Sequence, residues 1–268
     1  MGRALALELS REGCVVAVAD IDQERLAETA ALVERQGGAA SAHALDVSNR
    51  DDVFAFADQV VGMHQRVDIL INNAGVIMVS PLKESSLRDF EWVMSINLWG
   101  VVYGSLAFLP HLKRRPEANI VNISSTYGLI GVPLHVPYCT SKFAVRGFTE
   151  SLRMELFDTS VSVSGVYPNL IKTNMGPSGR YTGMEKYLNT DEILGRFYEL
   201  FETMEPDECA RIIIRESIRK NKSRVLVGKR LGAIEFLSRC LPGSYHRLIM
   251  REMVYKLFGK EAFSKMTE

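Results

Sequence analysis

Residues 67–75 read Val-Asp-Ile-Leu-Ile-Asn-Asn-Ala-Gly, a short apolar run that ends in two asparagines and a glycine. A continuous apolar run bounded by turn residues is typical of a strand buried on both faces of a parallel sheet. The same pattern recurs at residues 14–19, 39–47, 119–123 and 161–166, and amphipathic helical segments separate these runs. Strands that alternate with helices predict an α/β fold, a doubly wound parallel sheet in a single domain.

Polar and turn-forming residues gather where the predicted strands end. They are Asp20, Asp46, residues 72–75, Ser125 and Pro168. In open parallel sheets ligands bind beyond the carboxyl ends of the strands, so the sequence predicts a binding site at this edge.

Tyr138 and Lys142 are four residues apart in a predicted helix, which places both on one face. A phenol titrates near pH ~10, but a nearby ammonium stabilises the phenolate, so Tyr138 is a candidate general acid/base. Ser125 is a candidate for hydrogen-bonding the same substrate oxygen. The alternative is a half-buried tyrosine beside a lysine that extends to solvent.

Composition excludes several classes of protein. The 268 residues are 47% hydrophobic and 24% charged, and 32 Lys+Arg balance 32 Asp+Glu, so no global charge points to nucleic acid. The four cysteines have no metal-ligand spacing, which predicts no metal site, no disulfide framework and a reducing cytoplasm. No apolar run approaches the ~20 residues of a membrane span.

Taken in order, Asp46-Val47, residues 72–75, Asn97, Ser125, Tyr138-x-x-x-Lys142, and Pro168 with Thr173 resemble the short-chain dehydrogenase/reductase family over nearly the whole chain. The resemblance implies a Rossmann-like fold in which Tyr138 exchanges the proton of the substrate oxygen. It also implies that Lys142 holds ribose hydroxyls and lowers the pKa of Tyr138, that Ser125 orients the substrate oxygen, and that Asn97 anchors a water. The alternative for Asn97 is an amide in a helix interior that bonds the backbone.

The resemblance also implies a nicotinamide cofactor, bound by Gly2, Asp20, Asp46, Val47, Asn73, Ala74, Gly75, Tyr138, Lys142, Pro168, Ile171 and Thr173. A carboxylate at Asp20 would accept hydrogen bonds from both ribose hydroxyls and repel a 2′-phosphate, which favours NAD and leaves NADP as the alternative. Asp20 could instead only begin the turn before Asp22, the predicted helix cap.

The sequence departs from the family pattern at two places. Asn169 follows Pro168 where the family has glycine, and asparagine tolerates the same left-handed backbone. Residues 1–3 match only the end of the glycine-rich phosphate loop, so the first strand and most of that loop are missing. We therefore expect the strands that end at Asp20 and Asn72 to face a gap about one strand wide, and we hypothesise a sequence that starts about fifteen to twenty residues late.

The predicted organisation is a dinucleotide-binding and catalytic domain over residues 1–230, with a flap at 169–205, and a helical extension over 231–268. The predicted substrate pocket is apolar, with Met175, Tyr181, Met184 and Tyr187 from the flap, which favours a hydrophobic alcohol or ketone. The extension is basic. We favour packing of its apolar face on the domain or across a subunit interface, with membrane-surface contact as the alternative.

The sequence thus predicts an NAD-dependent oxidoreductase that interconverts a hydrophobic secondary alcohol and its ketone in the cytoplasm. The alternative is a non-catalytic or cofactor-impaired relative that acts as a binding or scaffold protein, because its phosphate loop is incomplete. A homodimer or homotetramer is expected from the resemblance alone.

Overall fold

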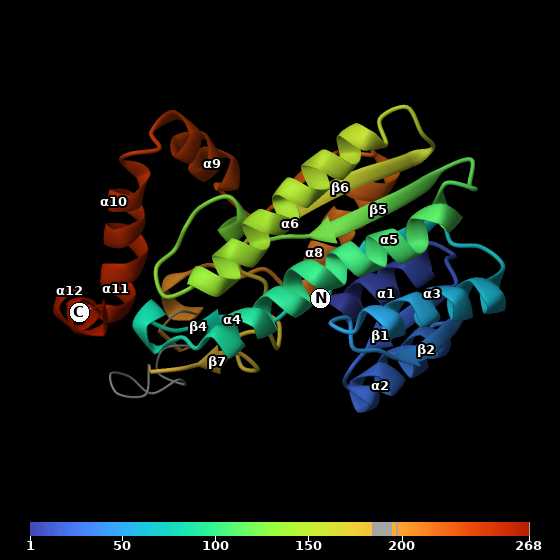
Figure 1. The fold of residues 1–268 in the computed structure, drawn as a ribbon, viewed down its shortest axis with the longest axis horizontal. Coiled ribbons are helices and arrows are strands. Elements are labelled where there is room, and N and C mark those ends of the chain that lie inside the picture. Colours follow the sequence, from blue (N-terminus) through green and yellow to red (C-terminus); the bar gives the residue numbers. More distant parts are fainter. Residues whose placement is uncertain (184–194, 197, 268) are drawn as a thin grey trace.

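The computed structural model describes residues 1–183, 195–196 and 198–267. Its main elements are α1 (Gly2–Arg11), β1 (Val16–Asp20), α2 (Gln23–Arg35), β2 (Ala40–Ala44), α3 (Arg50–His64), β3 (Ile69–Asn72), β4 (Met78–Val79), α4 (Leu87–Met94), η2 (Ser95–Trp99), α5 (Gly100–Leu112), β5 (Ala118–Ile123), η3 (Thr126–Gly128), α6 (Val136–Glu155), β6 (Val161–Pro168), β7 (Arg180–Tyr181), α8 (Pro206–Ile213), η4 (Ile214–Arg219), β8 (Arg224–Val227), α9 (Leu231–Cys240), α10 (Tyr245–Ile249), η5 (Met250–Val254), α11 (Tyr255–Phe258) and α12 (Lys260–Thr267). Figure 1 shows their arrangement. A short η1 turn (Leu82–Glu84) precedes α4.

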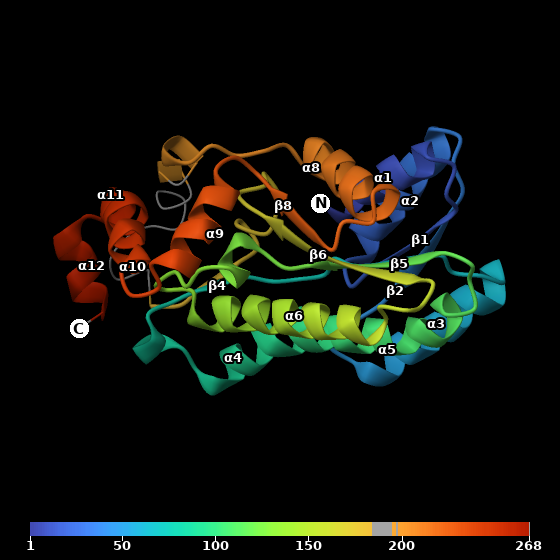
Figure 2. The ribbon, with the colours of Figure 1, turned by 90° about the horizontal axis from the view of Figure 1, so that it is seen from above.

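A parallel sheet in the order β3-β5-β6-β8 forms the centre of the fold. Helices α1 and α8 cover one face and helices α5 and α6 cover the other, as Figure 2 shows. Strands β5 and β6 are almost fully buried between these layers, as continuous apolar runs predict. The predicted α/β fold with a doubly wound parallel sheet is confirmed.

Local signals in the sequence set most helix boundaries. The side chain of Asp22 accepts a hydrogen bond from the Arg25 amide and caps α2, as predicted. Asn49 caps α3 and Ser86 caps α4 in the same way. These caps satisfy backbone amides that have no partner within the first turn of a helix.

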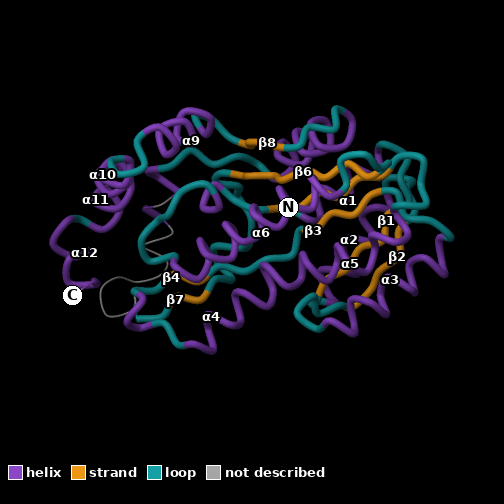
Figure 3. The backbone as a smooth tube through the Cα atoms, turned by 45° about the horizontal axis from the view of Figure 1, so that its top comes forward, coloured by secondary structure: helices purple, strands orange, loops and turns teal. Residues whose placement is uncertain are grey.

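The sheet is interrupted between β1 and β3. Among the described strands, β1 pairs only with β2 and β3 pairs only with β5, so β1-β2 and β3-β5-β6-β8 are separate sheets, shown in Figure 3. Both strands beside the break are only partly buried, in contrast to β5. A cavity of about 1680 Å³ lies between them and continues to the strand ends. The sheet is therefore broken between β1 and β3, and a missing strand as the cause of this break stays a prediction.

One helix, residues 87–112, is long and apolar enough to cross a membrane by length and composition. Its packing is that of a core helix, since Val101, Gly104 and Phe108 are buried against the domain. The π-helical turn η2 lies in its middle. Asn97 lies in this turn.

Three features were absent from the sequence interpretation. The β4–β7 pair joins the chain after β3 to the flap, α12 continues the extension, and the basic extension only partly buries its apolar side chains. Ile249, Val254, Leu257, Phe263 and Met266 are buried, in line with the favoured packing, whereas Phe236, Leu241 and Leu248 are exposed. Met184 and Tyr187 of the predicted pocket lie outside the described residues.

Candidate active site

Tyr138 and Lys142 lie one turn apart on α6 and are both nearly inaccessible, at 6% and 2% exposure. The Lys142 ammonium donates a hydrogen bond of 3.1 Å to the Ile123 carbonyl oxygen at the end of β5. It lies 5.7 Å from the centroid of the Tyr138 ring. The helix thus delivers a phenol and a lysine to the same strand end.

Ser125 follows β5 and begins the η3 turn, where its hydroxyl accepts a hydrogen bond from the Tyr127 amide. Ser125 also faces Tyr138 on α6, where its side chain acts to lower the pKa of the phenol against the larger effect of burial. Ser124 makes a second connection, because its hydroxyl donates to the Lys142 carbonyl oxygen at 2.9 Å. Ser124 therefore joins the segment before η3 to the helix that carries Tyr138.

Gly128 permits this close packing. A Cβ atom at Gly128 would lie 2.7 Å from the Lys142 carbonyl oxygen and would also clash with the Ser124 hydroxyl. We expect Gly128→Ala to reduce the free energy of unfolding by about 1–3 kcal/mol and to lower turnover, because η3 and Ser125 must move away from α6. Chemical denaturation and initial rates measure both effects.

Gly147 on α6 is the matched control, because nothing lies within 4 Å of a Cβ built there. Gly147→Ala should leave turnover unchanged and stabilise the helix by up to about 1 kcal/mol. Equal stability and turnover in the two alanine variants would contradict the proposed role of Gly128.

Asn97 is fully buried within the π-helical turn η2. Its amide group donates to the Val76 carbonyl oxygen (2.9 Å) and to the Ser141 hydroxyl (3.0 Å), and its oxygen accepts from the Val76 amide (2.8 Å). The backbone that it bonds belongs to the segment after β3 and not to its own helix. Asn97 therefore joins that segment to α6, and π-turns of this kind are frequent at functional sites.

Burial dominates the electrostatics of the site. It raises the pKa of Tyr138 to about 12, opposed by the hydrogen bond with Ser125. Burial also lowers the pKa of Lys142 to about 8. We expected Lys142 to lower the pKa of Tyr138; in this structure the net shift is upward, because desolvation of the phenolate is its largest cause.

A single cavity brings together every residue of the predicted cofactor site. Its lining includes Gly2 at the start of α1, Asp20 at the end of β1, Asp46 and Val47 after β2, residues 73–75 after β3, Tyr138 and Lys142 on α6, and Pro168, Ile171 and Thr173 after β6. Ser125 also lines it, whereas Asn97 lies behind Gly75. Cofactor binding by these residues stays a prediction.

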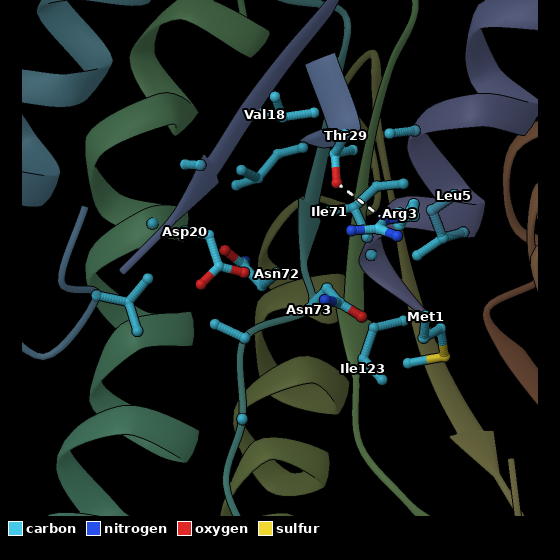
Figure 4. Close-up of a pocket in the computed structure, with 18 of the residues that line it drawn as sticks. Met1, Arg3, Leu5, Val18, Asp20, Thr29, Ile71, Asn72, Asn73 and Ile123 are labelled. Atoms are coloured by element: carbon cyan, nitrogen blue, oxygen red, sulfur yellow. Dashed lines mark hydrogen bonds between the residues drawn. The ribbon is translucent and has the colours of Figure 1, made fainter. Parts of the chain in front are cut away.

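Groups on two sides of this cavity fit a dinucleotide. The buried Asn73 Oδ1 atom has no hydrogen-bond partner among the described residues. Figure 4 shows it across the cavity from Asp20. A Cβ on Gly75 would lie 3.4 Å from the Lys142 ammonium, so this glycine keeps the ammonium open to the cavity. The N-terminus of α1 at Gly2 also lines the cavity. Its backbone amides have no side-chain cap and can therefore bind a phosphate.

Asp20 serves the turn as well as the cavity. One of its carboxylate oxygens accepts a hydrogen bond from the Asp22 amide at 3.0 Å. Asp20 therefore does form the turn before Asp22, as the alternative interpretation predicted. The second oxygen has no hydrogen bond with a described residue and can accept one from a ribose hydroxyl.

Tyr138 also belongs to a buried apolar cluster. Tyr127, Ile130, Val132, Cys139 and Ile249 are its buried members besides Tyr138. The Tyr138 hydroxyl donates to the Met175 sulfur at 3.9 Å. His135 is not placed to transfer a proton to the substrate oxygen. Its Nδ1 atom is hydrogen-bonded with the Pro133 carbonyl oxygen, and burial lowers its pKa.

The C-terminal helices contribute residues to this cluster that sequence reasoning missed. Ile249 is buried in it, and Ile234, Tyr245 and Met253 pack against it. The four-residue spacing of Ile249 and Met253 predicted an apolar helix face, but nothing in the sequence indicated that this face would reach the catalytic tyrosine.

Comparison with known proteins agrees with this fold and site. The model of the short chain dehydrogenase family matches residues 1–181. SadH of Mycobacterium tuberculosis, named as an oxidoreductase, is 38% identical over 251 residues, which cover 93% of this chain and 90% of that protein. The chain therefore belongs to the short-chain dehydrogenase/reductase family, a family of oxidoreductases with a Rossmann-like fold.

Other relatives show the range of this family. A cyclopentanol dehydrogenase of Comamonas testosteroni is 34% identical over 175 residues, 65% of this chain and 70% of that protein. A short-chain dehydrogenase/reductase from Burkholderia phymatum, solved with NAD, has a TM-score of 0.79 at 27% identity and covers 89% of this chain and 88% of that one. A metagenomic short-chain oxidoreductase, solved with NADP, has a TM-score of 0.69 at 28% identity and covers 84% and 90%.

Proposed function

We propose that this protein interconverts a hydrophobic secondary alcohol and its ketone, with NAD preferred over NADP. The observation that carries the proposal is the meeting of Ser125, Tyr138 and Lys142 at one end of the strand-edge cavity, with Asp20 at another. A nicotinamide bound there would supply or accept the hydride. A Comamonas relative named cyclopentanol dehydrogenase supports a secondary alcohol as the substrate class.

Tyr138 and Ser125 handle the substrate oxygen. With a pKa of about 12, the Tyr138 phenol is protonated at neutral pH and can donate its proton to a ketone oxygen. In the reverse direction the phenolate form of Tyr138 accepts the proton of the alcohol, after the phenol has lost its own proton. Ser125 hydrogen-bonds the same hydroxyl and orients the substrate oxygen beside it. The Met175 sulfur now accepts the hydrogen bond that a substrate oxygen would take.

Lys142 and Asn97 support this proton transfer. With a pKa of about 8, the Lys142 side chain is mainly an ammonium at neutral pH and can donate to ribose hydroxyls next to Gly75. Asn97 holds the backbone at Val76, and with it Gly75, in place through three hydrogen bonds. Because these bonds occupy its amide, its predicted water would have to use the second lone pair of its oxygen.

Asp20 is the proposed determinant of cofactor choice. The experiment is a panel of secondary alcohols and ketones, cyclopentanol included, assayed with NAD and with NADP. We expect turnover with the apolar members and a preference for NAD. Asp20→Ser should shift the ratio of kcat/KM values toward NADP by about tenfold or more, because it removes the repulsion between the carboxylate and a 2′-phosphate. A repulsion of about 1.4 kcal/mol corresponds to a factor of ten. An unchanged ratio would remove Asp20 from this role.

A cofactor-impaired binding protein is the second candidate. The observation in its favour is the break between β1 and β3, which adjoins the α1 N-terminus where the pyrophosphate would lie. The intact set of Asn97, Ser125, Tyr138 and Lys142 favours the enzyme. Titration with NADH separates the two, since the absence of a fluorescence change or thermal shift at millimolar cofactor would support the impaired protein.

We further propose a homodimer or homotetramer that works in the cytoplasm, where the four free cysteines stay reduced. Exposed apolar side chains on α5 and α6 support association, among them Leu106 at 54% and Phe143 at 41% exposure. Light scattering that gives the mass of one chain would contradict this assembly.

A further inference from the structure

The helical corner of residues 236–251, formed by the end of α9, the turn after it, α10 and the start of η5, exposes large apolar side chains to solvent. Phe236 is 66% exposed, Leu241 is 52% exposed and Leu248 is 48% exposed. The adjacent Ile249 is buried against the domain. The corner therefore has an inner apolar side that is covered and outer apolar side chains that no described residue covers.

The charge around this corner is strongly positive. Residues 229–260 contain seven Lys/Arg and two Glu, a difference of +5 in a chain whose net charge is zero. Both glutamates are neutralised locally, because Glu235 pairs with Arg224 and Arg239, and Glu252 pairs with Arg251 and Lys256. Arg247 has no ion pair with a described residue, so the charge exposed beside Leu248 is cationic.

Exposed apolar side chains among arginines are complementary to an anionic lipid surface. The apolar groups can enter the boundary between headgroups and acyl chains, while the arginines stay with the phosphates. A symmetric contact with a second copy through this corner would bring two net positive regions together, which is unfavourable. We propose that the corner of residues 236–251 docks on an anionic lipid bilayer.

The position of the corner gives this docking a consequence for the site. The Gly131 amide donates to the Tyr245 hydroxyl at 3.4 Å, and Ile249 packs in the cluster around Tyr138. The helices that would contact the bilayer are thus the same helices that pack around Tyr138. Lipid contact would place the membrane beside the proposed substrate side, although the docking itself does not depend on the proposed function.

Co-sedimentation of the full chain with vesicles tests the proposal. We expect binding to vesicles of phosphatidylglycerol and phosphatidylcholine in about equal amounts at about 0.1 M salt, much weaker binding at high salt, and no binding to phosphatidylcholine alone. The double variant Arg247→Gln/Arg251→Gln should lower the vesicle partition coefficient at least about tenfold. Each basic residue near an anionic surface contributes roughly a factor of five to binding. Phe236→Ser/Leu248→Ser should lower it at least as much, because it removes the apolar groups that enter the bilayer.

Matched controls lie on α3, at the opposite end of the molecule in Figure 1. Met63→Ser removes an apolar side chain that is 61% exposed, and Arg50→Gln removes an exposed arginine. Both should bind vesicles like the unmodified chain, and circular dichroism confirms that every variant is folded.

Three results would overturn the proposal. The unmodified chain could fail to sediment with anionic vesicles at low salt. The corner variants could bind as well as the α3 controls. Alternatively, Phe236→Ser/Leu248→Ser could change the oligomeric mass in solution while vesicle binding stays the same, in which case a second copy covers the corner.

Discussion

Tyr138→Phe is expected to lower kcat by about 10²–10⁴-fold, the usual contribution of general acid/base catalysis. The variant keeps the ring in the apolar cluster with Tyr127 and Ile249 and removes only the hydroxyl that faces Ser125 and Met175. The dissociation constant for NADH should change little, because the phenyl ring still lines the cavity. Steady-state rates and a fluorescence titration measure the two quantities.

Tyr167 supplies the matched control for this substitution. It is a buried tyrosine on β6, 1% exposed, and it does not line the cavity. The Tyr167 ring packs against Arg224, so Tyr167→Phe removes a buried hydroxyl outside the cavity lining and should leave kcat within about a factor of three. If Tyr138→Phe kept a third or more of the turnover, Tyr138 would not be the proton donor.

Lys142→Met is expected to abolish most turnover and to stabilise the protein without cofactor at neutral pH. The Lys142 ammonium is 2% exposed and donates one hydrogen bond, and burial lowers its pKa to about 8. Lowering a lysine pKa from its ordinary value near 10.5 to about 8 corresponds to roughly 3 kcal/mol of destabilisation while the group is charged. Methionine keeps the apolar stem and removes the buried charge.

The pH dependence of this gain follows from the proton balance. Between about pH 8 and 10.5 the unfolded chain holds the Lys142 proton and the folded chain has released it, so the stability of the unmodified protein rises with pH in this range. The advantage of Lys142→Met should therefore be largest below about pH 8 and shrink toward pH 10.5. Denaturant unfolding at several pH values measures it. A variant less stable than the unmodified protein at pH 7 would contradict a net cost of the buried ammonium.

Local patterns in the sequence were sufficient for most elements. The apolar runs predicted β1, β2, β3, β5 and β6, and Asp22 marked the start of α2, because strand burial and helix capping depend on nearby residues. The order of the site residues along the chain then predicted their meeting at the strand ends. The sequence also predicted a gap in the sheet beside β1, because residues 1–3 match only the end of the family's glycine-rich loop.

Contacts between distant segments were not predictable in the same way. The pairing of β4 with β7 and the packing of Ile249 near Tyr138 join residues separated by about one hundred positions, and no local pattern specifies such partners. The favoured packing of the whole extension was only partly right for the same reason. Its helical spacing identified apolar side chains, but did not distinguish Ile249, which is buried, from Leu248, which is exposed.

By itself, the sequence determined the α/β architecture, the one-turn spacing of Tyr138 and Lys142, and the positions of Ser125 and Asp20 at strand ends, because these depend on short-range periodicity and caps. Only the tertiary structure decided the protonation of the site. Tyr138 is buried in the cluster with Tyr127 and Ile249, and Lys142 is buried at the end of β5; this loss of water raises the pKa of Tyr138 and lowers that of Lys142. Desolvation depends on every segment that surrounds a group, so it could not be read from the residues alone.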